Sequence, residues 1–205
     1  MTSTDLHNFL RTRRSIRRFL SPTAKTGQSD PVPVSIIERI LETATYAPSA
    51  HNLQLWRFCV ITTSTVKLQL GKTLTDKMRI DMTAAGAPQR EIGTRVERSL
   101  HRIDEAPVII LLCRDVSAVR SEEPEEEIMA IQSVAAAGLQ LLLAAHAEGL
   151  GGNWICWPLY AQRAVCEALE LPGSWEPQAM FFLGYADEEP REKILKSLDE
   201  IMIKI

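Results

Sequence analysis

Apolar positions along this 205-residue chain follow two spacings, and each spacing predicts one kind of element. Apolar residues that recur every three or four positions predict helices, and short runs rich in β-branched and aromatic residues predict strands. The expected helices span 5–11, 35–47, 65–85, 88–102, 128–147 and 160–171. The expected strands span 57–62, 107–113, 152–156 and 178–184. Because helices and strands alternate irregularly, the pattern predicts an α+β fold with one central sheet.

Local signals refine the ends of these elements. Thr4 is the expected N-cap of the first helix. Ser35 and Glu38 have the spacing of a capping box, which would open the second helix, and Pro48 would end it. The run 107–113 is continuously apolar, which predicts a central strand that is buried on both faces.

Length and charge narrow the class of protein. The chain fits one domain that covers residues 1–205, and its net charge of −3 gives no reason to expect nucleic acid or an anionic membrane as a partner. The longest apolar run, 128–147, is alanine-rich and is interrupted by polar residues such as Ser133 and His146. We therefore interpret it as a buried helix and not as a membrane span.

The cysteines and histidines favour a reduced, metal-free protein. All four cysteines are isolated in the sequence, which is typical of reduced thiols in a cytoplasmic protein. The N-terminus has no apolar core of a signal peptide, which agrees with that localisation. The four histidines show no spacing of metal ligands, so no metal site is expected.

A dense cationic turn follows the first predicted helix. Arg13, Arg14 and Arg17 stand within five residues, and Ser15 lies between them. Arginine binds phosphate through a planar, bidentate fork, and a serine hydroxyl adds a donor. Lys193, beyond the last predicted strand, is a candidate for a second phosphate ligand. Two other interpretations stay open, which are a solvated basic patch and a short nucleic-acid contact.

A polar loop joins the second predicted helix to the first strand. His51, Asn52 and Gln54 offer donors and acceptors that suit the hydrogen-bonding edge of a flat ring. Ser49 and Ala50 are small enough for the backbone to approach such a ring. The alternative is a turn that merely stops the helix, in which the histidine is incidental.

A glycine-rich turn leads into the strand predicted for 152–156, which delivers Cys156 and Trp157 at its end, where pockets tend to form. Both Trp154 and Trp157 could be ordinary core aromatics. We interpret Trp154 as a core residue and Trp157 as part of a pocket wall.

These segments belong to a longer series of motifs. In chain order they are R-R-S-I-R-R-F at 13–19, A-P-S-A-H-N-L-Q-L-W at 47–56, A-P-V at 106–108, C-W-P-L-Y at 156–160, L-P-G-S-W-E-P at 171–177 and L-G-Y at 183–185. The series covers nearly the whole chain and resembles the nitroreductase family. Within that family it is most similar to the subgroup that contains the C-terminal flavin domain of the bifunctional glutamyl ligase of deazaflavin-coenzyme biosynthesis.

The resemblance implies a nitroreductase-like α+β fold with a central, mostly antiparallel sheet flanked by helices. It implies a homodimer with FMN at the subunit interface, and with the loop 49–52 contributed by the partner subunit. The basic turn would hold phosphate and ribityl oxygens, and Arg17 would lie near the pyrimidine edge of the ring. The residues implied to contact FMN are Arg13, Arg14, Ser15, Arg17, Pro48, Ser49, Ala50, His51, Asn52, Gln54, Ile155, Cys156, Trp157 and Lys193, and those implied to contact substrate are Trp157 and Tyr160.

The activity that the resemblance implies is a ping-pong oxidoreduction. Reducing equivalents would pass from NAD(P)H through FMN to a small organic acceptor such as a nitroaromatic, a quinone or an oxidised deazaflavin precursor. The flavin would carry the chemistry, so no catalytic side chain is expected. Two alternatives remain: a flavin-binding protein without turnover, in which Trp157 closes the pocket, and a small dimeric protein whose basic turn binds an acidic partner.

The sequence departs from the family pattern at three positions. Leu55 replaces a frequent proline, and Trp157 is bulkier than the small residue expected there, which would narrow the substrate entrance. The C-terminal tail carries Leu195 where the family has a second cation, so only Lys193 matches. Phosphate affinity would then be weaker unless Lys196 compensates.

Overall fold

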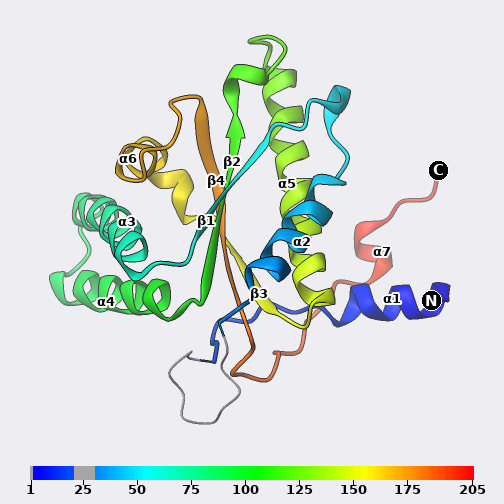
Figure 1. Ribbon diagram of the computed structural model, residues 1–205, viewed down its shortest axis with the longest axis horizontal. Helices are drawn as coiled ribbons and strands as arrows, with labels where there is room; N and C mark the ends of the chain where they lie inside the picture. Colours follow the sequence, from blue (N-terminus) through cyan, green and yellow to red (C-terminus); the bar gives the residue numbers. More distant parts are fainter. Residues whose placement is uncertain (1, 21–30) are drawn as a thin grey trace.

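The computed structural model describes residues 2–20 and 31–205, and an antiparallel sheet forms its centre (Figure 1). The strands are β1 (Trp56–Ile61), β2 (Val108–Asp115), β3 (Gly151–Ile155) and β4 (Trp175–Gly184), in the spatial order β1-β2-β4-β3. Each neighbouring pair is antiparallel. The sequence-based prediction of one central, mostly antiparallel sheet is therefore confirmed.

Helices cover both faces of this sheet (Figure 1). One face carries α2 (Val34–Thr45) and α5 (Pro124–Ala147), and the other carries α3 (Ser64–Ala84), α4 (Gln89–Glu105) and α6 (Gln162–Ala168). β2 is buried along its whole length, as predicted. Ile110 and Leu112 pack under α2 and α5, whereas Ile109 and Leu111 pack under α3 and α6, because side chains alternate along a strand.

The helix α5 is long and apolar enough to cross a membrane by length and composition alone. In the fold it packs against the sheet, and Ala137 and Leu141 are fully buried. Burial against other protein elements explains its apolar composition, so the interpretation as a buried helix is confirmed.

Two predicted helix caps are wrong. The helix α1 (Ser3–Thr12) is capped by Thr2 and not by Thr4; the Thr2 hydroxyl accepts from the N–H of Asp5 at 3.2 Å, and the Asp5 carboxylate accepts from the N–H of Thr2 at 2.7 Å. The helix α2 begins after Pro33, and no side chain caps it. Pro33 fixes its own φ near −59°, so the helix starts early and Ser35 already lies inside the first turn.

The last strand begins at Trp175, three residues before the predicted start, and it contains Pro177. A proline cannot donate to a sheet ladder. Here Pro177 pairs with Cys113 at a register shift between Leu112 and Cys113, and such irregularities tolerate a missing donor. The helix α6 is correspondingly shorter than predicted and follows a 3₁₀ turn at Trp157–Tyr160.

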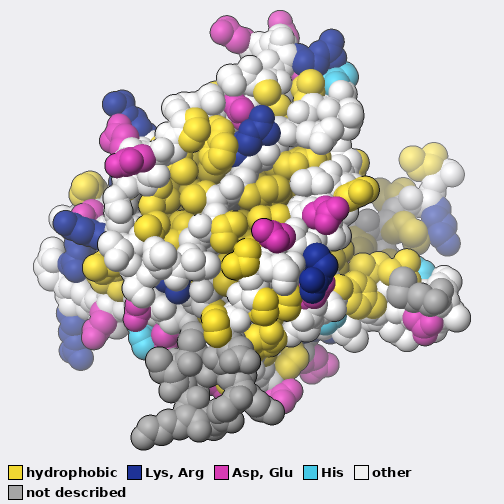
Figure 2. All heavy atoms as spheres, viewed as in Figure 1, with side chains coloured by type: hydrophobic (Ala, Val, Ile, Leu, Met, Phe, Trp, Pro, Cys, Tyr) yellow, Lys and Arg dark blue, Asp and Glu magenta, His cyan; other side chains and the backbone are white. Residues whose placement is uncertain are grey.

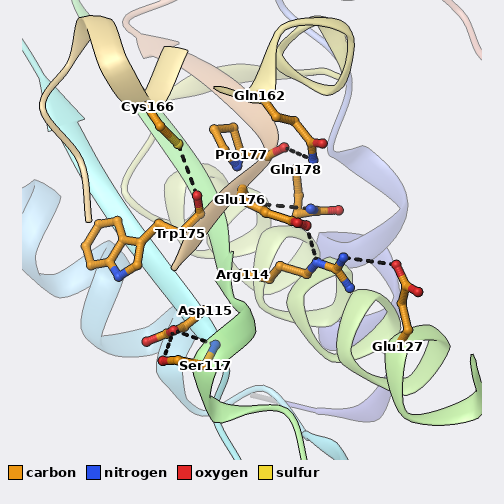
Figure 3. A network of polar contacts seen from close by, with 10 residues as sticks. All are labelled: Arg114, Asp115, Ser117, Glu127, Gln162, Cys166, Trp175, Glu176, Pro177 and Gln178. Atoms are coloured by element: carbon orange, nitrogen blue, oxygen red, sulfur yellow. Dashed lines mark hydrogen bonds and ion pairs between the residues drawn. The ribbon is translucent and has the colours of Figure 1, made fainter. Parts of the chain in front are cut away.

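A polar network closes the end of the sheet where β2 ends and β4 begins (Figure 3). The Arg114 guanidinium, whose side chain is 10% exposed, donates to Glu176 on β4 at 2.7 Å and to Glu127 on α5 at 3.0 Å. Gln162 of α6 donates to the carbonyl of Pro177 at 2.9 Å. These contacts tie helices from both faces to the same two strands.

Candidate functional site

The basic segment predicted as a turn lies along the edge strand β3. Ser15 forms a parallel bridge with Gly152, and the N–H of Ile16 donates to the Gly152 carbonyl at 3.1 Å. Ile16 and Phe19 are buried and anchor the segment in the core. The arginines between these anchors are therefore held by an ordered backbone, which lowers the conformational entropy that a ligand would otherwise have to remove.

Glu188 fixes the same segment from the loop after β4. Its carboxylate accepts the backbone N–H of Arg17 and that of Arg18, the latter at 3.2 Å, and it pairs with the Arg18 guanidinium at 3.5 Å. The hydrogen bond from the Arg17 backbone is the main reason that the pKa of Glu188 lies below its usual value. Sequence reasoning assigned no role to this residue.

The arginines of the segment have different partners. The Arg14 guanidinium donates to the carbonyls of Arg11 and Arg13, the latter at 2.9 Å, so it caps the C-terminal end of α1. Within residues 2–20 and 31–205, neither Arg13 nor Arg17 forms an ion pair. Arg14 is therefore engaged structurally, whereas Arg13 and Arg17 have no ion-pair partner among these residues.

Arg13 borders a first cavity of about 250 Å³, whose wall also includes His146 on α5 and Gly151 and Gly152 on β3. The His146 ring stacks on Phe9 with centroids 4.9 Å apart, and its Nε2 lies 3.1 Å from the hydroxyl of Thr12. Burial and, next, the positive charge of Arg13 lower the pKa of His146. The cavity wall therefore carries two arginines, Arg13 and Arg14, and one carboxylate, Glu188, beside an imidazole whose pKa is lowered.

A second cavity, of about 230 Å³, borders the following residues of β3. Its wall consists of Arg17, Ser99, Arg102, Ile103, Asn153, Trp154, Ile155, Trp157, Met180 and Phe182. Arg17, Ile155 and Trp157 were predicted site residues, and the fold brings these three together. Trp157 forms part of the wall, as the sequence interpretation expected.

Three polar residues of this second cavity were missed by sequence reasoning. Ser99 and Arg102 lie one turn apart on α4, for which the sequence predicted a helix without any functional residue, and Asn153 is the middle residue of β3. Asn153 is 8% exposed, and its Oδ1 is the one buried side-chain N or O atom of the described residues that has no hydrogen-bond partner. An unsatisfied buried acceptor costs about 1–3 kcal/mol. The sequence did hold one signal for Asn153, because a polar residue in the middle of a short buried strand indicates a possible ligand contact.

Trp154 belongs mainly to the core, as interpreted. Its ring meets Phe181 edge-on with centroids 4.9 Å apart, and Gly138 of α5 leaves the space for it. Its indole N–H donates to the Cys156 sulfur at 3.1 Å. The exposed Cys156 is therefore held beside the second cavity but is not one of the residues that border it.

The polar loop after α2 forms a tight 3₁₀ turn at Ala50–Asn52. His51, Asn52 and Gln54 all have a positive φ, between 50° and 55°, which is uncommon for residues other than glycine. Hydrogen bonds hold this backbone: the N–H of Ala50 donates to the Ser133 hydroxyl of α5 at 3.0 Å. Strained backbone that is maintained by its surroundings is a frequent property of binding loops.

The polar side chains of this loop are largely exposed, and they contact one another or the first turn of α5. Gln54 donates to Asn52 at 3.3 Å, and its N–H donates to the Ser49 hydroxyl at 3.1 Å. His51 lies 3.6 Å from the Glu126 carboxylate of α5. The exposed amide groups are therefore presented outward on a fixed turn, with Pro48 at its start.

Within one chain the fold does not bring this loop to the basic segment. The loop contacts α5 at Ser133, whereas Thr12, at the start of the basic segment, contacts α5 at His146. At 1.5 Å per helical residue these contacts are about 20 Å apart along the axis. Figure 1 shows the two segments near opposite ends of α5.

Besides the loop 48–54 and Cys156, three predicted ligands lie outside both cavities, namely Ser15, Lys193 and Tyr160. Lys193 is exposed in the extended tail, and Tyr160 is 70% exposed in the 3₁₀ turn after β3. Neither residue borders the cavity of Arg13 or the cavity of Arg17. Their assigned roles stay predictions.

Comparison with known proteins now identifies the family. The model of the Nitroreductase family matches residues 10–185. The chain belongs to the nitroreductase family. It is 28% identical over 191 residues to YfhC of Bacillus subtilis, provisionally named an NAD(P)H nitroreductase, and the match covers 92% of this chain and 88% of YfhC.

Two further relatives show the range of the family. The 5,6-dimethylbenzimidazole synthase of Rhodospirillum rubrum is 28% identical over 181 residues, which are 86% of this chain and 80% of the synthase. A solved structure from Desulfovibrio desulfuricans, provisionally described as a nitroreductase in complex with FMN, has a TM-score of 0.71 and 27% identity. That match covers 100% of this chain and 98% of the other.

Family membership confirms what the motif series indicated about the fold and the general class. The chain has the nitroreductase fold and belongs to a family of FMN-binding oxidoreductases. The likeness to the deazaflavin-ligase subgroup stays a prediction, and the synthase shows that one relative carries a different activity in its name.

Proposed function

We propose that this protein is an FMN-dependent oxidoreductase that takes reducing equivalents from NAD(P)H and delivers them to a small organic acceptor. The observation that carries the proposal is the second cavity. There Arg17 and Arg102, the buried amide of Asn153 and the ring of Trp157 border one hollow beside β3. The acceptor would be a nitroaromatic, a quinone or an oxidised deazaflavin precursor.

The residues present fit FMN. Arg13, on the wall of the first cavity, and Ser15, beside Gly152 of the same wall, would hold the phosphate and the ribityl oxygens, because a guanidinium and a hydroxyl are donors for such oxygens. Arg17 would bind the polar edge of the ring, and Ile155 and Trp157 would pack beside it. The unpartnered oxygen of Asn153 supports this fit, because it demands a donor from a ligand. When bound, FMN would supply the hydride and electron transfer that protein side chains lack.

The side chains of the second cavity would tune that chemistry electrostatically. Arg17 and Arg102 place two positive charges at a partly enclosed wall, where charge interactions are stronger than in water. They would therefore stabilise negative charge on a bound ring, without any reorganisation during the reaction. Trp157, Met180 and Phe182 would exclude water from the same space.

A homodimer would complete the site. The separation of about 20 Å along α5 keeps the loop 48–54 away from its own basic segment. The loop presents its amides outward, so in a dimer it would reach the cavities of the second copy. The exposed apolar residues Ile128, Ile131 and Leu139 on α5 would form part of the interface.

Colour and its loss test the proposal directly. The purified protein, or the protein reconstituted with FMN, is expected to be yellow and to bleach when NADH or NADPH is added without oxygen. A yellow protein that neither reduced nicotinamide bleaches would instead be a flavin-binding protein without nicotinamide-driven turnover. A protein that cannot take up FMN would contradict the flavin site altogether. An acceptor screen that includes nitro compounds, quinones and the unsaturated deazaflavin precursor would then identify the second substrate.

A further inference from the structure

We propose that Asn153 is a cofactor-positioning residue whose amide oxygen accepts the imide N–H of the flavin ring. The inference rests on the proposed FMN site and adds to it a residue that the motif series did not include. It starts from the unpartnered, buried Oδ1 of Asn153, a residue that borders the second cavity.

The strand fixes the direction of this side chain. Asn153 pairs with Phe182 in the middle of β3, and side chains alternate along a strand, so Gly151, Asn153 and Ile155 point to the same face. That face packs toward α4, because Ile155 joins the core cluster that contains Ile103 of α4. The amide is therefore held by the sheet and not by a loop, which gives a ligand contact a defined position.

The described neighbours leave the oxygen unsatisfied. Trp154 carries one neutral N–H donor of the cavity wall, and this donor is engaged with the Cys156 sulfur at 3.1 Å. The residue that follows in the strand thus cannot satisfy Asn153. A buried carbonyl oxygen in a ligand cavity calls for a donor from the ligand.

The donors and acceptors of the cavity match the pyrimidine edge of a flavin. An oxidised flavin ring has a single N–H, which lies between two carbonyl groups. The cavity provides one unpartnered acceptor, on Asn153, together with the guanidinium donors of Arg17 and Arg102. The guanidinium groups suit the two carbonyl acceptors of the ring and the Asn153 oxygen suits its single N–H, while the Ser99 hydroxyl of the same wall can donate or accept.

A binding cycle with a modified cofactor tests the assignment. Dissociation constants of FMN and of N3-methyl-FMN, in which a methyl group replaces the imide hydrogen, are measured by flavin fluorescence for the wild type and for Asn153→Ala. The wild type is expected to bind N3-methyl-FMN at least about tenfold more weakly than FMN, since one hydrogen bond to a buried acceptor is lost. Asn153→Ala is expected to bind FMN more weakly and to lose most of this discrimination.

Further variants separate positioning from folding. Asn153→Asp keeps an acceptor oxygen and is expected to retain the preference for FMN, whereas Asn8→Ala on the exposed face of α1 is the matched control and should leave both constants unchanged. A merely structural asparagine would, on substitution, lower the melting temperature and weaken both flavins by the same factor. That result would overturn the inference.

The same cycle distinguishes the inference from the function beneath it. A wild type that binds FMN and N3-methyl-FMN equally would overturn the role of Asn153 and leave the FMN site standing. An Asn153→Ala variant that still discriminates tenfold would do the same. A wild type that binds neither flavin would overturn the proposed function and the inference together.

Discussion

At the scale of single residues, two adjacent arginines have different tasks. Arg13 borders the first cavity without an ion pair among the described residues, whereas Arg14 caps α1 through two backbone carbonyls. Both residues border that cavity, so the difference between them lies in the backbone carbonyls that engage the Arg14 guanidinium. The motif R-R-S-I-R does not distinguish them.

Arg13→Ala is expected to raise the dissociation constant of FMN at least about tenfold, because a hydrogen bond to a charged group contributes about 1.5–3 kcal/mol. The melting temperature should change little. Arg14→Ala is the matched comparison, and it should lower the melting temperature by loosening α1 while changing FMN affinity less. Equilibrium dialysis and calorimetry measure the two effects. Unchanged FMN affinity in Arg13→Ala would refute its phosphate role.

The sequence predicted only part of the candidate site. Arg17, Ile155 and Trp157 belong to motifs and were named in advance, and the fold places them around one cavity. Arg102 and Asn153 were not named, because the packing of α4 beside β3 brings them there, and this packing is a long-range property. The local sequence of a helix does not show which of its charged residues will lie beside a strand that is distant in the chain.

At the scale of elements, close contact between α5 and the sheet depends on Gly138. A Cβ atom built there would lie 2.7 Å from Trp154 and 2.9 Å from Phe181, both of which are held in the core. The absence of a side chain thus lets the helix approach β3 and β4, and it keeps Trp154 beside the second cavity. Glycine has a low helix propensity and destabilises the interior of α5, but it is the residue that allows this close packing.

Gly138→Ala is expected to lower the free energy of unfolding by about 1–3 kcal/mol, since extra volume in a packed core forces its neighbours to shift. Gly93→Ala on α4 is the matched control, because a Cβ there meets no atom within 4 Å. That variant should gain about 0.5–1 kcal/mol from helix propensity. Denaturant titration of both variants decides the matter, and a Gly138→Ala protein as stable as the wild type would contradict the packing argument.

Periodicity predicted the existence and type of the main elements well and their ends less well. The buried strand β2 and the long helix α5 were recognisable because a continuous apolar run is a local signal. The start of β4 was missed because Pro177 argues against a strand, and only its pairing with β2 at a register shift permits it. The failed cap at Ser35 has a similar origin, since Pro33 decided where α2 begins.

At the scale of the whole molecule, the proposed site is divided between regions that one chain keeps apart. The cavities lie along β3 and the strained loop lies farther up α5. Figure 2 shows apolar side chains gathered across the face over the sheet and α5. Ile128, Ile131 and Leu139 of α5 are between 41% and 54% exposed. A second copy that covers this helix would bury these residues and bring its own loop toward the cavities.

This arrangement predicts that assembly and FMN retention fail together. The wild type should sediment at twice the chain mass of 22.9 kDa. Ile131→Glu places a charge where the proposed interface is apolar, and burying an unpaired carboxylate is strongly unfavourable, so the variant should sediment as a single chain and lose its flavin. Ile80→Glu is the matched control, because Ile80 is also an exposed apolar residue but lies on α3, at the opposite face of the sheet. It should remain dimeric and yellow. A single-chain Ile131→Glu protein that binds FMN as tightly as the wild type would show that one chain holds the whole site, and the shared-site arrangement would have to be abandoned.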